Sequence, residues 1–358
     1  MKLVTVIYSC YQQEMTGNER GEIVTTMNDV ARIAGVSGST VSHVLNGTRA
    51  VRETTRIKVL AAIESTGYRR NGLARSLAMQ RTQTLGLAIS VLSNPYFGSL
   101  VNTIEKVATT AGYNIVLADT HDDPERESRT IGTLLDRQID GLILAPAGGS
   151  HGRHDTLEMV RASRTPMVLI DRFLDFPCDQ YAPENYEPVK RLTAHLLELG
   201  HRKIAAIIGA RGLSTTVERR DGFYAAVAEA GVERSQVLFE EGHSTAEGGH
   251  AAMARLLQSV EPPTAIVSMN NAMTIGVMKA LRDAGLRVPR DVALVGFDDF
   301  EWADSFEPRL TTMAQDVETM GAEAVQMLLD RIVGSDAPFA RHSIAPFMRH
   351  RNSCGCAD

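Results

Sequence analysis

The side chains with the most evident chemical purpose are the basic residues of segment 26–81. This segment carries nine arginines and lysines against three acidic residues, a net charge of +6. Because the whole chain has a formal charge of −6, the remainder carries −12. Clustered Lys and Arg neutralise phosphates, and an acidic remainder is repelled by the same polyanion. The charge distribution therefore predicts nucleic-acid binding near one end of the chain.

Groupings that would support catalysis or hold a metal are scarce in the sequence. His151-x-x-His154 has ligand-like spacing, but it lies among glycines in an expected loop. Four cysteines, two of them in Cys354-Gly355-Cys356, do not make a disulfide framework in a chain this long and fit a reducing compartment. We predict no catalytic residue, no metal and no cofactor. An enzyme built on the α/β body is the alternative, and turnover of a sugar by the purified protein would support it.

Length and composition predict an ordinary globular protein. A chain of 358 residues with 44% hydrophobic and 22% charged residues is expected to form two or three folding units. It has no apolar run of about 18 residues, so no transmembrane span is expected. Residues 1–25 show neither a helical period nor caps, and we expect a disordered extension or a start-site artefact there. A cytoplasmic location follows, with nucleoid association through DNA.

Helix signals divide residues 26–70 into three short helices. Thr26 with Asp29 resembles a capping box, Gly35 ends the first helix, and Ser37 opens the second after a three-residue turn. This is the spacing of a helix-turn-helix. The helices are expected at about 26–34, 37–45 and 53–65, the last with an apolar face at Ile57, Leu60, Ala61 and Ile63 or nearby residues.

After residue 84, short apolar runs alternate with amphipathic segments, which predicts βαβ units on a parallel sheet. Strands are expected at 85–91, 114–118, 141–145, 167–170, 204–208, 264–268 and 292–297. Helices are expected at 97–111, 125–137, 188–199, 217–230, 246–258, 272–284 and 317–333. Doubly wound sheets bind ligands where loops leave the carboxyl ends of strands, so polar residues after these runs are the candidates for a site.

The motif DVARIAGVSGSTVSHVLN, residues 29–46, resembles the lactose/galactose-repressor (LacI/GalR) family of bacterial regulators, and the resemblance extends to about residue 352. It implies an α/β protein: a three-helix helix-turn-helix domain joined to a periplasmic-binding-protein-like (type I) domain of two doubly wound subdomains. Further motifs of the family are Asn94-Pro95-Tyr96-Phe97, Ile170-Asp171-Arg172 and Gly296-Phe297-Asp298-Asp299. The implied function is a DNA-binding transcriptional regulator, expected to be a repressor controlled by a sugar or sugar derivative.

The resemblance also implies a domain plan and partners. The DNA-binding domain is expected at 26–70, a hinge helix and linker at 71–82, the effector-binding and dimerisation domain at 83–352 and a tail at 353–358. A homodimer on a pseudo-palindromic operator is expected, because one head offers a small footprint and two-fold symmetry matches a palindrome. No membrane partner is expected.

The family's DNA-contacting positions fall on the second helix and the hinge. Gly38, Ser39 and His43 match base-reading positions, and Ser42 shares the outward face. Gly38 is smaller than the residues often found there. Hinge residues Asn71, Arg75, Ser76 and Leu77 match a segment that folds on DNA, in which the residue matching Leu77 wedges between base steps in the minor groove. Ser37, Thr40 and Asn46 are expected to hold phosphates or cap helices, and Thr48 and Arg49 are expected to contact phosphates.

The family's effector positions carry the hydroxyl-binding and aromatic groups that a sugar requires. Arg219 and Asp298 are the strongest candidates, and their alternative role is a structural ion pair across the cleft. Glu184 departs from the family's usual Asp, which puts that loop's ligand contacts in doubt, and His243 would either contact the ligand or face solvent. The full expected set is Tyr96, Phe97, Asp171, Glu184, Thr215, Arg219, His243, Asn270, Asp298 and Gln315. An exported sugar-binding protein is a second alternative, which the basic head disfavours.

Overall fold

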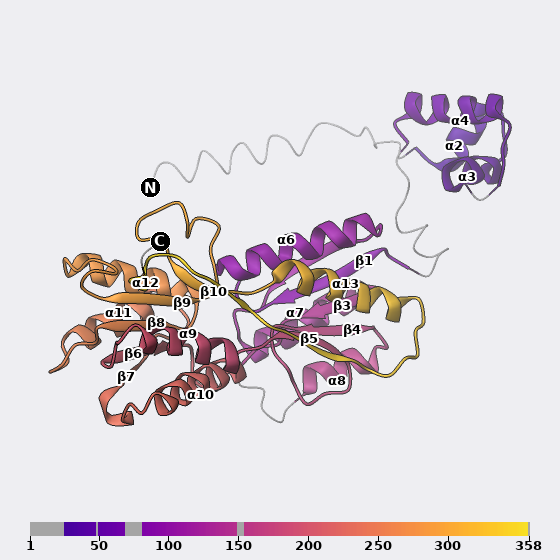
Figure 1. Cartoon of the computed structure of the whole chain (residues 1–358). Coiled ribbons are helices and arrows are strands. Elements are labelled where there is room, and N and C mark those ends of the chain that lie inside the picture. Colours follow the sequence, from indigo (N-terminus) through magenta and orange to yellow (C-terminus); the bar gives the residue numbers. More distant parts are fainter. Residues whose placement is uncertain (1–24, 48, 69–80, 149–153, 357–358) are drawn as a thin grey trace, which may run out of the picture. The chain divides into compact units, whose positions relative to one another are not determined.

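The computed structural model describes residues 25–47, 49–68, 81–148 and 154–356, drawn in colour in Figure 1. Their contacts divide the chain after Gln80 into two compact units, here called the head and the body. Thr48 and the predicted hinge residues Asn71, Arg75, Ser76 and Leu77 lie outside the described residues. Within the described ranges, no helix has the length and apolarity needed to cross a bilayer.

The head contains the three predicted helices, α2 (Met27–Ala34), α3 (Gly38–Asn46) and α4 (Glu53–Thr66). The capping box at Thr26 and Asp29 is confirmed, because the Thr26 hydroxyl accepts from the Asp29 amide while the Asp29 carboxylate accepts from the Thr26 amide. Gly35 then turns the chain with a φ of 69°, and the Ser37 hydroxyl accepts from the Thr40 amide to begin α3. The sequence signals thus fix where these two helices begin and end.

The core of the head is small, and it differs from the expected one at α4. Six hydrophobic residues are buried: Val30, Ala31, Ala34, Val41, Val59 and Ala62. The predicted apolar face of α4 is wrong at Ile57, Leu60 and Ala61, which are exposed. Val59, Ala62 and Ile63 instead form the inward stripe, at the i, i+3, i+4 spacing of one helix face.

The body contains two six-stranded sheets of matching topology. The first has the order β11-β5-β4-β3-β1-β2 and the second the order β12-β10-β9-β8-β6-β7. All pairings are parallel except that of β10 with β12. In the first sheet the strands are β1 (Thr84–Ile89), β2 (Asn114–Asp119), β3 (Gly141–Leu144), β4 (Met167–Ile170), β5 (Asp179–Pro183) and β11 (Arg341–Ile344). In the second they are β6 (Ile204–Ile208), β7 (Leu238–Glu241), β8 (Ala265–Ser268), β9 (Ala293–Phe297), β10 (Thr311–Ala314) and β12 (Phe347–Arg349).

Helices cover both faces of each sheet, which explains why the central strands are continuous apolar runs. On the first sheet, α6 (Pro95–Thr110) packs beside α13 (Val317–Ile332), and α7 (Pro124–Asp136) beside α8 (Asp155–Ala162). On the second, α9 (Tyr186–Glu198) packs beside α10 (Ser214–Glu229), and α11 (Ala246–Leu257) beside α12 (Asn271–Asp283); a short 3-10 helix spans Arg234–Gln236.

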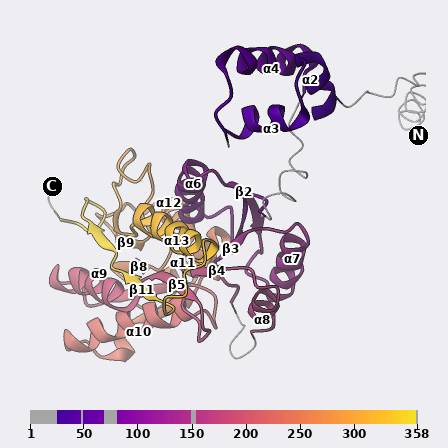
Figure 2. The same ribbon diagram turned by 90° about the vertical axis from the view of Figure 1, so that its right-hand side faces the viewer.

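The chain crosses between the two subdomains three times, after β5, after β10 and between β11 and β12. As a result the subdomains exchange helices. Helix α9 follows a strand of the first sheet but buries Val189, Leu192 and Leu196 in the core of the second. Helix α13 follows a strand of the second sheet but buries Met320 and Leu328 in the core of the first, where it lies along α6 (Figures 1 and 2).

The seven expected strands and seven expected helices of the body are present, with small shifts at their ends. Expectations for the body omitted α8 and the strands β5, β7, β10, β11 and β12. These missed strands lie toward the edges of the sheets, and β7 and β11 have no fully buried residue. Their sequences therefore lack the continuous apolar run that identifies a central strand.

A buried carboxylate on α7 makes the stability of the body depend on pH. Desolvation raises the pKa of Glu127 from 4.5 to about 6, although the Ala147 amide donates to its Oε2 at 2.6 Å. Because the folded pKa exceeds the unfolded one, the stability that Glu127 contributes is complete below pH 4.5 and is lost as the pH rises through 6. Glu127→Gln is therefore expected to stabilise the protein at pH 7.5 by up to about 2 kcal/mol.

The measurement is the melting temperature of wild type and Glu127→Gln between pH 4.5 and 7.5. The advantage of the variant should shrink toward zero at the acidic end, where the wild-type carboxyl is protonated in the folded state and half protonated in the unfolded state. An offset that stays the same at every pH would show that packing, and not ionisation, explains the difference.

Candidate functional site

The candidate DNA-binding surface is the outward side of α3. Val41 faces the core and is fully buried, whereas Ser39 is exposed and Ser42 and His43 are half-buried. Ser39, Ser42 and His43 follow the i, i+3, i+4 spacing that places side chains on one helix face. The arrangement fits a recognition helix, and Figure 2 shows α3 set across from α4.

The first turn of α3 is organised by hydroxyl groups. The Ser37 hydroxyl lies 2.8 Å from that of Ser39 and 2.9 Å from that of Thr40. Ser37 therefore caps the helix, one of the two roles that the sequence left open. Gly38 is half-buried at the same turn, and a Cβ there would make an ordinary 3.4 Å contact with the Asn28 side chain. Arg49, beyond the end of α3, is exposed.

In the body, the sequence-predicted effector residues converge on a cavity between the two subdomains. Its volume is about 80 Å³, small beside the roughly 300–1,000 Å³ of most ligand sites. Its walls include eight of the ten expected residues: Tyr96, Phe97, Asp171, Thr215, Arg219, Asn270, Asp298 and Gln315. The first three come from the first sheet and its helix α6, and the others come from the second subdomain and the crossing after β10.

Two aspartates occupy equivalent places at the ends of equivalent strands. Asp171 follows β4 and Asp298 follows β9, and both are buried and have a φ of 70°. A non-glycine residue rarely adopts this left-handed conformation, which is often found at ligand sites. The strained turn at each strand end directs a carboxylate toward the cavity from each subdomain.

Arg219, on the first half of α10, is buried and held from several sides. Its Nε donates to Asn185 Oδ1 at 2.8 Å and one terminal nitrogen donates to the Met269 carbonyl at 2.6 Å. The guanidinium carbon lies 3.7 Å from the centre of the Phe297 ring, in cation–π contact. Arg219 and Asp298 both belong to the second subdomain, so their electrostatic interaction does not cross the cleft.

The two amide side chains that line the cavity use part of their hydrogen-bonding capacity within the protein. Asn270 caps α12, since its Oδ1 accepts from the Met273 amide at 2.8 Å. Gln315 donates through Nε2 to Asp298, and its buried Oε1 has no hydrogen-bond partner among the described residues. A buried acceptor without a partner is costly unless a ligand or water satisfies it. Gln315 Oε1 is therefore available to a donor inside the cavity.

Burial dominates the electrostatics of this site. Desolvation raises the pKa values of Asp171 and Asp298, although Arg172 and Arg219 partly offset the effect. Desolvation likewise raises the pKa of Tyr96 and lowers that of Arg219. Each charged form is therefore less stable here than in water, and hydrogen bonds from a ligand would offset part of that cost.

Two of the expected effector residues lie elsewhere, and several lining residues were missed. Glu184 accepts from the Ser343 hydroxyl at 3.5 Å, and neither Glu184 nor His243 lines the cavity. The side chain of His243 is 66% exposed and lies 3.3 Å from Glu241 Oε1, so it faces solvent. Missed residues are Val91, Asn94, Asp122, Arg172, Gly209, Leu213, Thr216, Ser244 and Met269. Asp122 and Ser244 follow β2 and β7, where the strand-end rule could have found them.

A wider, open groove of about 750 Å³ adjoins this cavity and shares Tyr96, Asp298 and Gln315 with it. Its other walls come from α6, the segment 299–304, the end of β10, the start of α13 and the segment 347–351. Three of its acidic residues, Glu301, Asp304 and Glu318, are exposed. We place the candidate effector site in the smaller cavity, because buried charged groups surround it from both subdomains.

Comparisons with known proteins find a matching family model for the head and another for the body. The family model "Bacterial regulatory proteins, lacI family" matches residues 26–71, and the model "Periplasmic binding protein-like domain" matches residues 193–354. The HTH-type transcriptional repressor PurR of Haemophilus influenzae (strain PittEE) is 34% identical over 334 residues, which cover 92% of this chain and 98% of the relative. The ribose operon repressor of Escherichia coli (strain K12) is 35% identical over 331 residues, with 92% and 100% covered.

Solved structures give the same result. The Lac repressor dimer bound to operator and the anti-inducer ONPF matches with a TM-score of 0.81 and 27% identity, over 92% of this chain and 99% of that one. A complex of the transcriptional regulator CelR with cellobiose matches with a TM-score of 0.68 and 30% identity, over the same shares of the two chains. From the helix-turn-helix head, the two-sheet body and these relatives, we conclude that the chain belongs to the lacI family of bacterial regulatory proteins and is a DNA-binding transcriptional regulator.

Proposed function

We propose that this regulator is a repressor whose operator binding is controlled by a small, uncharged sugar held between the two subdomains of the body. The observation that carries the proposal is the group of buried charged side chains from both subdomains around one cavity. Asp171 and Asp298 accept hydrogen bonds and Arg219 donates them. Adjacent sugar hydroxyls both donate and accept, so one ring satisfies carboxylates and guanidinium together.

The charge of the lining favours an uncharged ligand over an anionic one. Three aspartates, Asp122, Asp171 and Asp298, face two arginines, Arg172 and Arg219. Asp122 and Asp171 are already paired with Arg172, at 2.6 and 3.2 Å. A phosphate or carboxylate would add negative charge where the pKa values of Asp171 and Asp298 are already raised. We therefore expect sugar phosphates and sugar acids to bind more weakly than neutral sugars.

The aromatic lining favours a sugar over a nucleobase. Among the described residues of the cavity wall, Tyr96 and Phe97 are the aromatic ones, adjacent on α6 and in edge-to-face contact at 4.9 Å. A flat base is held best between parallel faces, and these two rings do not provide them. The nearby ring of Phe297 is covered by Arg219. The small cavity and the similarity to the ribose operon repressor point to a pentose such as D-ribose.

On the DNA side, we propose that a homodimer places α3 of each head in the major groove of a pseudo-palindromic operator. Ser39, Ser42 and His43 would contact base edges, while Thr40 and Arg49 would contact phosphates. Two half-sites are expected, since one such head covers few base pairs. Selection from random duplexes tests this proposal. Enriched sites without two-fold symmetry would contradict it.

The effector proposal is tested by a thermal-shift screen of the full chain. D-ribose, other pentoses, hexoses, sugar acids, sugar phosphates and nucleobases are compared at equal concentration. Stabilisation by a neutral sugar, followed by a change in affinity for the selected operator when that sugar is present, supports the proposal. Stabilisation by a nucleobase or a sugar phosphate alone would show that the ligand class is wrong.

We further propose that ligand exchange requires the subdomains to open, and Gly148 offers a direct test. Gly148 follows β3 of the first subdomain, and a Cβ there would lie 2.1 Å from Leu213, which precedes α10 of the second. Gly148→Val should therefore press on Leu213, which lines the cavity, and oppose closure by about 1–3 kcal/mol. Affinity for the screened sugar is expected to fall about 5- to 150-fold in calorimetric titration.

Gly132 provides the matched control. It lies on α7 of the same subdomain and a Cβ there meets no atom within 4 Å. Gly132→Val should bind the sugar like the wild type. If Gly148→Val also binds with wild-type affinity, the two subdomains do not need to approach closely at this point for binding.

A further inference from the structure

Four potential metal ligands meet at the C-terminal end of the second subdomain. His195 lies on α9, His350 directly follows β12, and Cys354 and Cys356 lie in the terminal turn. Their ligating nitrogen and sulfur atoms all lie within 4.8 Å of one another. Its residues are not among those that line the effector cavity or form α3, and neither proposed activity uses them.

The spacing of these atoms resembles that of a tetrahedral zinc site. Zn–S bonds of about 2.3 Å and Zn–N bonds of about 2.0–2.1 Å at tetrahedral angles place sulfur and nitrogen about 3.6 Å apart. Cys354 Sγ lies 3.5 Å from His350 Nε2, and Cys356 Sγ lies 3.6 Å from His195 Nε2. We propose that His195, His350, Cys354 and Cys356 bind one Zn²⁺ ion.

The backbone turn at Gly355 places the thiols of Cys354 and Cys356 on the same side of the C-terminal segment. Gly355, between them, has a φ of 92°, a conformation that L side chains rarely adopt. This turn allows Cys354 and Cys356 to approach the same pair of imidazoles. The two histidine rings are perpendicular, with their centres 5.0 Å apart, so both can direct a nitrogen toward one point.

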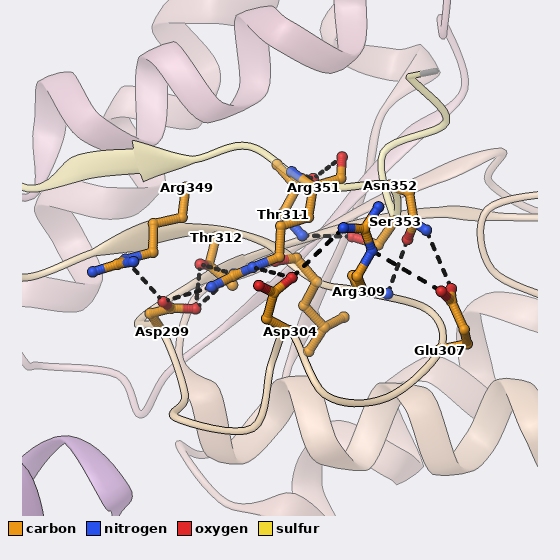
Figure 3. A network of polar contacts seen from close by, with 11 residues as sticks. Asp299, Asp304, Glu307, Arg309, Thr311, Thr312, Arg349, Arg351, Asn352 and Ser353 are labelled. Atoms are coloured by element: carbon orange, nitrogen blue, oxygen red, sulfur yellow. Dashed lines mark hydrogen bonds and ion pairs between the residues drawn. The ribbon is translucent and has the colours of Figure 1, made fainter. Parts of the chain in front are cut away.

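The segment that carries these ligands is fixed in place by its neighbours. Arg351 makes a two-pronged contact with Asp299, at 2.8 and 3.0 Å, and Figure 3 shows Arg349 reaching the same carboxylate. The Ser353 hydroxyl accepts from the Thr311 amide at 2.8 Å, and the Thr311 hydroxyl donates to Cys354 Sγ at 3.4 Å. A preorganised set of ligands binds metal with little further ordering.

The composition of the cluster predicts a structural site. Two cysteines and two histidines give zinc four protein ligands and leave no open position for a substrate. Cys354 is fully buried, whereas His350 is exposed, so the ion can enter from the surface. Once bound, it would join the C-terminal segment to α9.

Metal content and cobalt spectroscopy test the proposal on untagged, full-length protein. The purified protein is expected to contain about one zinc per chain by mass spectrometry of the metal. After removal of metal under reducing conditions, Co²⁺ should give the charge-transfer and d–d absorption of tetrahedral thiolate coordination, and Zn²⁺ should displace it. Cys356→Ser and His195→Gln should each lower the affinity for Zn²⁺ at least about tenfold in competition with a chromophoric chelator.

Cys178→Ser is the matched control, because Cys178 is a buried cysteine of the first subdomain, remote from the cluster. It should bind zinc like the wild type. The proposal is overturned if the reduced wild type fails to bind Zn²⁺ at one ion per chain, or if both ligand variants keep wild-type affinity. A Cys354–Cys356 disulfide that persists under cytosol-like reducing conditions would also overturn it. The wild-type titration needs no substitution, so a variant that misfolds does not prevent a decision.

Discussion

Arg219→Met should lower the affinity for the effector by about 30-fold to several thousand-fold, because the guanidinium is a buried donor of the cavity wall that interacts electrostatically with Asp171 and Asp298. Removing one partner of a buried, hydrogen-bonded charge costs about 2–5 kcal/mol in binding. Methionine keeps the length and much of the volume of the side chain. The measurement is calorimetric titration with the sugar identified by the thermal-shift screen.

The stability of the same variant separates a binding role from a structural one. Desolvation lowers the pKa of Arg219, which means that burial penalises its charge in the folded protein. A melting temperature that stays unchanged or rises, together with lost binding, is the pattern of a ligand-binding residue. A cooperative loss of stability with binding preserved would instead assign Arg219 a structural role through Asn185 and Met269.

Arg220 offers the neighbouring control. It follows Arg219 on α10, its side chain is 40% exposed, and it pairs with Asp221 at the surface. Arg220→Met removes the same charge from the same turn of helix without approaching the cavity. It should bind the sugar with wild-type affinity, which shows that the effect at Arg219 does not arise from net charge.

Val59→Asp is expected to abolish operator binding while leaving effector binding intact. Val59 is fully buried on α4 in a core of six buried residues. An unpaired carboxylate there costs several kcal/mol, and a domain this small has little stability to lose. Operator affinity should fall at least about 100-fold, the equivalent of about 3 kcal/mol. Gel-shift titration with the selected operator measures it, and the thermal shift with sugar reports on the body.

Leu60→Asp places the same charge on the adjacent residue of α4, where 46% of the side chain is exposed. It should retain a folded head. If Leu60→Asp also unfolds the head, the outer face of α4 must be buried against another part of the assembled protein. The exposed residues Ile57 and Leu60 would then mark that contact surface. Loss of effector binding in Val59→Asp would show that the head and the body do not fold independently.

Much of the fold could be predicted because its signals are local. Glycine stops, the Thr26 cap and the Ser37 cap define α2 and α3 within a few residues of sequence. The central strands could be predicted because both of their faces are buried, which makes their sequences continuous apolar runs. Edge strands such as β11 could not, since their pairing is supplied by residues far away in the chain, as Arg341 with Gln180 shows.

The effector cavity was predictable to the extent that its residues follow strand ends or match family motifs. Asp171 and Asp298 do both. Arg172 was missed because its role depends on Asp122, fifty residues earlier, which it contacts at 2.6 Å. The cysteine and histidine cluster was missed for a similar reason. Cys354-Gly355-Cys356 is visible in the sequence, but its partner His195 comes from a helix that only the fold brings close.

The exchange of α9 and α13 between the subdomains sets the order in which the protein can mature during synthesis. The head emerges first and contains its own core, so it can fold early. The first sheet emerges next but lacks α13, which begins at Val317, and β11, which begins at Arg341. The second sheet lacks β12 until residue 349 has been made. A ribosome that stops between the end of α4 and Val317 releases a chain with a complete head and two unfinished subdomains.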